Sequence, residues 1–107
     1  MSKMLIVTTE TVPGREIAAV MGLVDGSTIQ TRHVGSHIVA GLMTLIGGEV
    51  KGYVTAMNSA RDQAMDRMIA KAEAMGADAI VCTRFSTSQI MSGGAEIFTY
   101  GTAVKLR

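Results

Sequence analysis

The longest regular pattern of apolar and polar positions in this chain runs through residues 47–81. Apolar side chains recur there at spacings of three and four, which places them on one face of an α-helix. They are Val54, Met57, Ala60, Ala64, Met65, Met68, Ala72 and Met75. The pattern predicts a helix that starts between Tyr53 and Ser59. We expect it to end at Gly76, because glycine readily adopts the left-handed conformation that closes a helix.

Strand patterns flank this helix on both sides. A short β-branched run at residues 4–9 predicts a first strand. Residues 16–32 alternate loosely and are interrupted by Asp25-Gly26, so either two strands meet there in a tight hairpin or one long strand carries a bulge there. After the helix, runs at residues 79–91 and 96–106 are joined by Ser-Gly-Gly and predict an antiparallel pair. One face of the last run carries small residues, which predicts that another element packs closely on it.

A second helix is predicted at residues 37–46, where the chain is apolar on nearly every side. Ser36 can cap its start and Gly47-Gly48 can end it. The run is too short to cross a bilayer, so burial on all sides requires a neighbouring subunit, and Gly41 would permit close approach. The elements together predict an α+β fold, with an antiparallel sheet and two helices packed on it.

The composition indicates one domain that forms part of an assembly. The chain has 107 residues, of which 48% are hydrophobic and 18% are charged, and its formal net charge is +1. A monomer with so little charge would have difficulty covering its apolar surface, so we expect a homo-oligomer with a single domain over residues 1–107. The basic residues are scattered, which argues against binding to nucleic acid. No run could span a membrane or serve as a signal peptide, so we expect a cytoplasmic protein.

Arg61 departs from the helical pattern, since the spacing places it between Met57 and Met68 on the face that should be dry. A guanidinium keeps its charge when it is buried, so it needs a partner. We expect an ion pair with Glu49 or Glu96, or a contact at a subunit interface, and anion binding is the alternative. If the ion pair exists, Arg61→Leu would leave a carboxylate unpaired and destabilise the protein.

Two further residues stand out in the run at 79–91. Alternation places Ile80, Cys82 and Arg84 on one strand face. Cys82 is the only cysteine, which excludes an intramolecular disulfide and any CxxC motif. We expect it to be a small buried hydrophobe, with a reactive or metal-binding thiol as the alternative. Arg84 must either form a salt bridge across a subunit contact or belong to a ring of arginines that binds an anion.

Candidate metal ligands are few, because His33, His37 and Cys82 are the only imidazoles and thiol of the chain. The two histidines are four residues apart, as two ligands on one helical face would be, but Gly35 and Ser36 place the helix start between them. A ring of subunits could instead gather one ligand from each copy. We expect the methionines of the long helix to pack in the core. No pattern typical of catalysis occurs, such as a Walker loop or HExxH, so a non-enzymatic role is favoured.

Several segments resemble the YbjQ family of small uncharacterised bacterial proteins, and the similarity spans nearly the whole chain. The matching segments are Gly47–Tyr53, Ala60-Arg61, Arg67-Met68, Gly76–Phe85 and Ala95–Val104. Members of the family are labelled as candidate heavy-metal-binding proteins. The resemblance implies a dodecin-like β-α-β-β core that assembles into a ring-shaped homopentamer, with extra short strands helping the subunits to associate.

The resemblance also bears on the candidate site. It places Glu49, Tyr53, Arg61 and Arg84 among the patterned positions of the family, and we take these four as candidate ligand-binding residues. The sequence therefore predicts a homo-oligomer that binds a heavy-metal ion or a small ligand at subunit interfaces. A structural or interaction scaffold without a ligand is the alternative.

Overall fold

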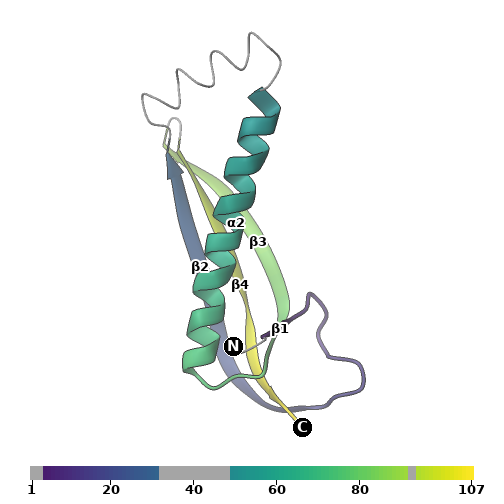
Figure 1. The fold of residues 1–107 in the computed structure, drawn as a ribbon. Helices are drawn as coiled ribbons and strands as arrows, with labels where there is room; N and C mark the ends of the chain where they lie inside the picture. The colour runs from purple at the N-terminus through teal and green to yellow at the C-terminus, as the bar shows by residue number, and fades with distance from the viewer. Residues whose placement is uncertain (1–3, 32–48, 92–93) are drawn as a thin grey trace.

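A computed structural model describes residues 4–31, 49–91 and 94–107 and shows a long helix on a four-stranded sheet (Figure 1). The elements are β1 (Leu5–Ile6), β2 (Ile17–Thr31), α2 (Glu49–Ala74), β3 (Ala79–Met91) and β4 (Gly94–Leu106). The strand order is β1-β3-β4-β2, with β1 parallel to β3 and all other pairs antiparallel. The predicted α+β class and the predicted antiparallel pair of β3 and β4 are confirmed, but the sheet is mixed rather than antiparallel throughout, because β1 pairs parallel to β3.

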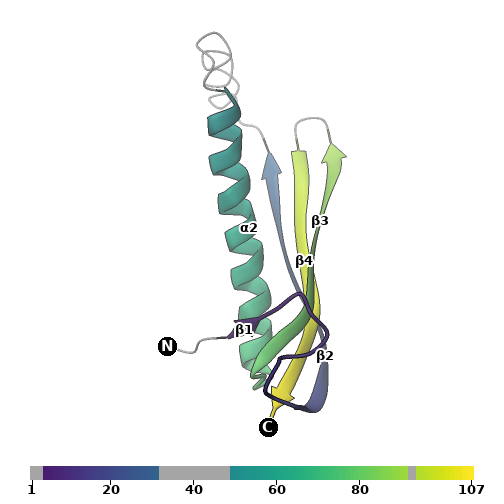
Figure 2. The ribbon, with the colours of Figure 1, turned by 90° about the vertical axis from the view of Figure 1, so that its right-hand side faces the viewer.

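One of the two predicted helices is observed. In the described ranges α2 is the only helix, and no helix there is both long and apolar enough to cross a membrane. The helix predicted at residues 37–46 lies outside the described residues. α2 lies along one face of the sheet, as the side view in Figure 2 shows.

The start of α2 was predicted too late, whereas its end was predicted correctly. The helix begins at Glu49 and runs through Gly52, which is possible because a glycine costs a helix only about 1 kcal/mol relative to alanine. At the other end, Gly76 has a positive φ of 80°. The Ala77 N–H donates to the Ala72 carbonyl at 3.0 Å, which is the hydrogen bond that closes a helix around a left-handed residue.

β2 is one long strand, so the hairpin alternative at Asp25-Gly26 is wrong. The strand pairs with β4 without interruption from Gly22 to Thr31, and its irregularities lie earlier, in residues 17–22. Gly26 serves instead for close approach to the helix. A methyl group there would overlap the Ala64 carbonyl oxygen and lie 2.6 Å from the Met68 nitrogen. Glycine therefore allows the backbone of α2 to rest on the backbone of β2.

The face of the sheet toward α2 forms the larger part of the core. A stripe of residues spaced by four is fully buried on the helix: Ala60, Ala64, Met68 and Ala72. The sheet presents Val24, Ile80, Ile97, Thr99 and Ala103 to it. The prediction that an element packs closely on the small residues of β4 is confirmed, and that element is α2. Alanines make the approach possible because they add almost no thickness to the helix.

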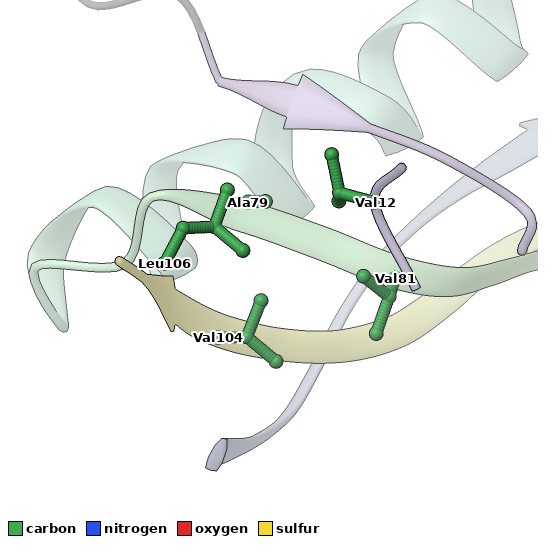
Figure 3. Close-up of a cluster of buried hydrophobic side chains, with 5 residues drawn as sticks. All are labelled: Val12, Ala79, Val81, Val104 and Leu106. Atoms are coloured by element: carbon green, nitrogen blue, oxygen red, sulfur yellow. The ribbon is translucent and has the colours of Figure 1, made fainter. Parts of the chain in front are cut away.

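A second cluster lies on the opposite face, at the end of the sheet near β1. Figure 3 shows Val12, from the segment after β1, pointing toward side chains of β3 and β4. The five buried members are Val12, Ala79, Val81, Val104 and Leu106. The N-terminal segment therefore covers this part of the sheet from the side away from α2.

The rest of that opposite face is uncovered in the described structure, and we call it the open face. Cross-strand partners share a face, so the register places Val20, Leu23 and Ile29 of β2 beside the even-numbered residues of β4. These three side chains are 69%, 71% and 58% exposed. Phe98 and Tyr100 of β4 stack on the same face, with ring centroids 5.5 Å apart. The open face therefore carries aliphatic side chains beside an aromatic pair.

The chain is elongated, which explains how so much apolar surface stays exposed. Its Cα atoms extend over 54 × 24 × 24 Å. The radius of gyration is 17.2 Å, whereas a compact domain of this length has about 13 Å. A two-layer sandwich of one helix and one narrow sheet cannot bury both faces of the sheet by itself.

Candidate functional site

Arg61 does not lie in the dry interface, so the prediction of a buried guanidinium is wrong. The side chain is exposed, and its Nη1 donates to the Asn58 Oδ1 at 3.0 Å. The buried stripe of α2 follows steps of four residues, and each such step turns by about 40° around the helix axis. The stripe therefore winds away from Arg61 at the N-terminal half of the helix, where Ala60 and Ala64 make the contact.

Ile80, Cys82 and Arg84 do not share a strand face as alternation predicted. The register of β3 against β4 shifts between Val81 and Arg84, so Cys82 and Thr83 together oppose Gly101. This extra residue is a β-bulge, and it reverses the alternation. Ile80 consequently faces α2, whereas Arg84 pairs with Tyr100 and lies on the open face.

Cys82 is the residue that makes the bulge. Its φ is 57°, which makes it the one non-glycine residue of the described chain in the left-handed region. Its N–H donates to the Thr9 carbonyl at 3.0 Å. The side chain is half-buried and packs against the cluster of Figure 3. Its apolar surroundings fit the expected small hydrophobe, but the side chain is half-buried rather than buried.

The guanidinium of Arg84 is held by main-chain oxygens. Nη1 donates to the Thr8 carbonyl at 2.8 Å and to the Thr83 carbonyl at 2.9 Å. Among the described residues, no carboxylate lies within salt-bridge distance of it. The side chain remains exposed. Arg84 therefore presents a fixed positive charge at the border between the open face and the N-terminal segment.

The positions of the other predicted site residues relative to Arg61, Cys82 and Arg84 are not described by the structure. His33 and His37 lie outside the described residues. Glu49 and Tyr53 belong to the first turns of α2, but their side chains lie outside the described part of the structure. The predicted site is therefore described only at Arg61, Cys82 and Arg84, and Arg61 lies on α2, whereas the other two belong to β3.

The donor groups that are described do not fit a heavy-metal site. No group of three or more histidine, cysteine, aspartate or glutamate side chains comes together in residues 4–31, 49–91 and 94–107. A soft metal ion needs several convergent donors, and thiolates above all. Cys82 offers a single sulfur beside apolar side chains.

The bulge and the open face were not predicted from the pattern of apolar and polar residues. Gly101 was the available signal for the bulge, because a methyl group there would lie 2.6 Å from Ile80 Cγ2 and 3.2 Å from Thr83 Oγ1. The Thr83 hydroxyl is buried beside it and finds no hydrogen-bond partner in the described structure. The aliphatic members of the open face were hidden because the strand that carries them was not distinguished from a hairpin.

The comparison with protein families decides where the chain belongs. Residues 4–107 match the YbjQ family model, which is described as "Putative heavy-metal-binding". This chain belongs to the YbjQ family. Relatives named UPF0145 protein cover nearly its whole length: one from Archaeoglobus fulgidus is 50% identical over 98% of this chain and 97% of its own. Another, from Halorubrum lacusprofundi, is 54% identical over 92% of this chain and 95% of its own.

These relatives correct the expectation that the family is bacterial, because the relative from Archaeoglobus fulgidus is archaeal. Bacterial relatives are also present, and the one from Shewanella frigidimarina is 50% identical over 96% of both chains. A crystal structure of a protein of unknown function from Pediococcus pentosaceus, assigned to the DUF74 family, has the same fold. It superposes with a TM-score of 0.65 over 97% of this chain and 98% of that chain, at 16% identity. The likeness supports the fold and says nothing of the function.

Proposed function

We propose that this YbjQ-family chain is a cytoplasmic, non-enzymatic protein that assembles into a ring of identical subunits and holds a small ligand where the open face of one subunit meets its neighbour. The observation that carries the proposal is the exposure of Val20, Leu23 and Ile29 on one face of β2. Exposed apolar surface of this kind is typical of a protein interface. A pentamer is the size of ring that the family resemblance implies.

Arg84 favours an anionic ligand over a heavy-metal ion. It lies on the open face opposite Tyr100, and two main-chain carbonyls orient its Nη1 while the side chain stays exposed. A guanidinium recognises carboxylate or phosphate groups. In a ring, each subunit would contribute one such cation beside an aromatic pair. Glu49, Tyr53 and Arg61 are the next candidates for binding this ligand. A metal ion would instead need His33 and His37 as ligands.

The experiment is native mass spectrometry of protein purified without an affinity tag, with elemental analysis of the same sample. We expect a closed ring that carries a small organic mass and no stoichiometric heavy metal. A ring that carries nothing would favour the scaffold without a ligand, and a bound metal would restore the metal-site hypothesis. A monomer at working concentration would overturn the proposal.

A matched pair of variants tests which face makes the ring. Leu23→Glu places a charge on the open face, so we expect it to release monomers. Phe85→Glu is the control, because Phe85 is 46% exposed on the same sheet but pairs with Thr99 and so lies on the side of α2. We expect the control to keep the ring. Rings in both variants would exclude the open face as the contact surface.

A further inference from the structure

Three consecutive residues of β3 hold three consecutive carbonyls of the N-terminal segment. The Cys82 N–H donates to the Thr9 oxygen at 3.0 Å and the Thr83 N–H donates to the Val7 oxygen at 3.0 Å. Arg84 completes the set, because its Nη1 donates to the Thr8 oxygen at 2.8 Å. Together with the hydrogen bond that the Val7 N–H donates to the Ile80 carbonyl at 3.0 Å, these contacts attach residues 7–9 to the edge of the sheet beyond β1.

The bulge makes this arrangement possible. In a regular strand, the N–H groups of successive residues point to opposite edges, so only one of two neighbours could reach the N-terminal segment. The positive φ of Cys82 turns the backbone so that both N–H groups reach that segment. Gly101 accepts the bulge on the other side, since a side chain there would approach the Val81 oxygen to 3.1 Å.

The same geometry determines where the thiol lies. The Cys82 side chain packs against the cluster that Val12 covers from the N-terminal segment. The described chain gathers no set of three potential metal ligands around it or elsewhere. Its backbone, in contrast, adopts the left-handed conformation, which is unfavourable for any residue with a Cβ.

We propose that Cys82 serves this chain through its backbone, by forming the bulge that holds residues 7–9 on the edge of β3, and that its thiol is not the heavy-metal ligand of the protein. This inference departs from the description of the family at the only thiol of this chain. It does not depend on the ring or on the ligand of the proposed function, because all of the contacts lie within one subunit.

Substitutions of Cys82 in the full chain separate a backbone role from a packing role. Valine resembles cysteine in size and is more apolar, so packing alone predicts that Cys82→Val is harmless. A β-branched residue is strongly disfavoured in the left-handed region, so the backbone role predicts at least about a tenfold loss in the folding equilibrium constant. Cys82→Gly should stay within about threefold of the parent, because relief of the backbone offsets lost packing.

Amide hydrogen exchange is the second measurement. We expect the Thr83 amide to exchange at least about tenfold faster in Cys82→Val and to stay protected in Cys82→Gly. Ser88→Val is the control, since it introduces valine at an exposed position of the same strand outside the bulge. Parent-like stability and Thr83 protection in Cys82→Val would overturn the backbone role.

Cadmium tests the thiol directly. We expect no thiolate-to-metal absorption when cadmium is added to the parent, and the same cadmium content in the parent and in Cys82→Gly. A thiolate band in the parent that disappears in the Gly and Val variants alike would overturn this part of the proposal. The mass of the assembly, measured separately, reports on the proposed function and is not affected by either result.

Discussion

Arg61 and Arg84 show how one side chain can be displaced from its expected surroundings by geometry a few residues away. Arg61 sits on the average apolar face of α2 but beside a contact stripe that winds around the helix. Arg84 sits on the expected strand but after a bulge that reverses its alternation. Within the described structure, both guanidinium groups donate to oxygen atoms of uncharged groups, Asn58 for one and main-chain carbonyls for the other.

The exposure of Arg61 reverses the expected effect of its removal. Arg61→Leu should change the free energy of unfolding by no more than about 0.5 kcal/mol, because no carboxylate among the described side chains pairs with it and surface substitutions are usually this mild. Arg67→Leu on the same helix is the comparison. Arg67 Nη1 donates to the Ser27 carbonyl of β2, so we expect a loss of about 1 kcal/mol. Urea unfolding of both variants gives the two values, and a loss above 2 kcal/mol for Arg61→Leu would restore an ion-pair role.

At this scale the sequence identified which residues were unusual but not where they point. The helical period placed Met68 correctly, since it is fully buried, but Met75 on the same predicted face is 38% exposed. Arg84 and Cys82 could not be placed, because one inserted residue in a strand reverses all positions that follow. The period of a helix is more tolerant of a local irregularity than the period of a strand.

The contact between α2 and β2 leaves no room for a side chain at Gly26. Gly26→Ala should lower the free energy of unfolding by about 3 kcal/mol, because the added methyl group meets backbone atoms of α2, which cannot move independently. Thermal or urea unfolding checks this, with Ser27→Ala as the control. Ser27 is the next residue of the strand, and its side chain lies on the open face. Equal stability of both variants would mean that α2 can shift outward freely.

The connection from α2 into β3 carries a pH-sensitive contact at Asp78. The Leu106 N–H donates to the Asp78 Oδ2 at 2.8 Å and Lys105 Nζ lies 3.5 Å from Oδ1. The Leu106 N–H, helped by the charges of Lys105 and Arg15, outweighs desolvation and lowers the pKa of Asp78 below 3.8. A lowered pKa stabilises the fold above the unfolded value, and this contribution is lost as the pH falls through the folded value.

The free energy of unfolding of Asp78→Asn should therefore differ from that of the parent by a constant amount above about pH 5. This difference should shrink as the pH falls below about 4. Urea unfolding across this range measures the difference. Lys105→Met is the control: it removes a weaker cause of the shift and keeps the Leu106 hydrogen bond, so most of the pH dependence should remain. A difference that stays constant down to pH 2 would exclude Asp78 as the titrating group.

Helices and strands could be predicted where the apolar period was long or where glycine marked a turn. The end of α2 at Gly76 and the β3–β4 pair followed from local chemistry. The single strand β2 did not, because Asp25-Gly26 is also a hairpin sequence. What decides is the tertiary contact of Gly26 with α2, and a residue so distant in sequence leaves no local signal.

In the described residues, α2 covers one face of the sheet and the N-terminal segment covers only part of the other, so assembly would change the apparent stability of the molecule. If neighbouring subunits cover the open face, folding and association are linked, and the midpoint of thermal unfolding should rise with protein concentration. We expect an upward shift over a hundredfold dilution series of the parent and a smaller one for Leu23→Glu. A midpoint that does not depend on concentration in the parent would contradict coupled assembly.

The pairing of β2 with β4 has a consequence during synthesis. β2 emerges directly after β1, yet its hydrogen-bonding partner β4 follows only after α2 and β3. Until then the nascent chain holds a strand of 15 residues with both edges unpaired, and α2 is the element that can shelter it. Such non-local pairing folds slowly and exposes strand edges to other chains. The close contact of α2 with Gly26 would therefore form before the sheet does. It would protect β2 from pairing with other chains while the protein is still on the ribosome.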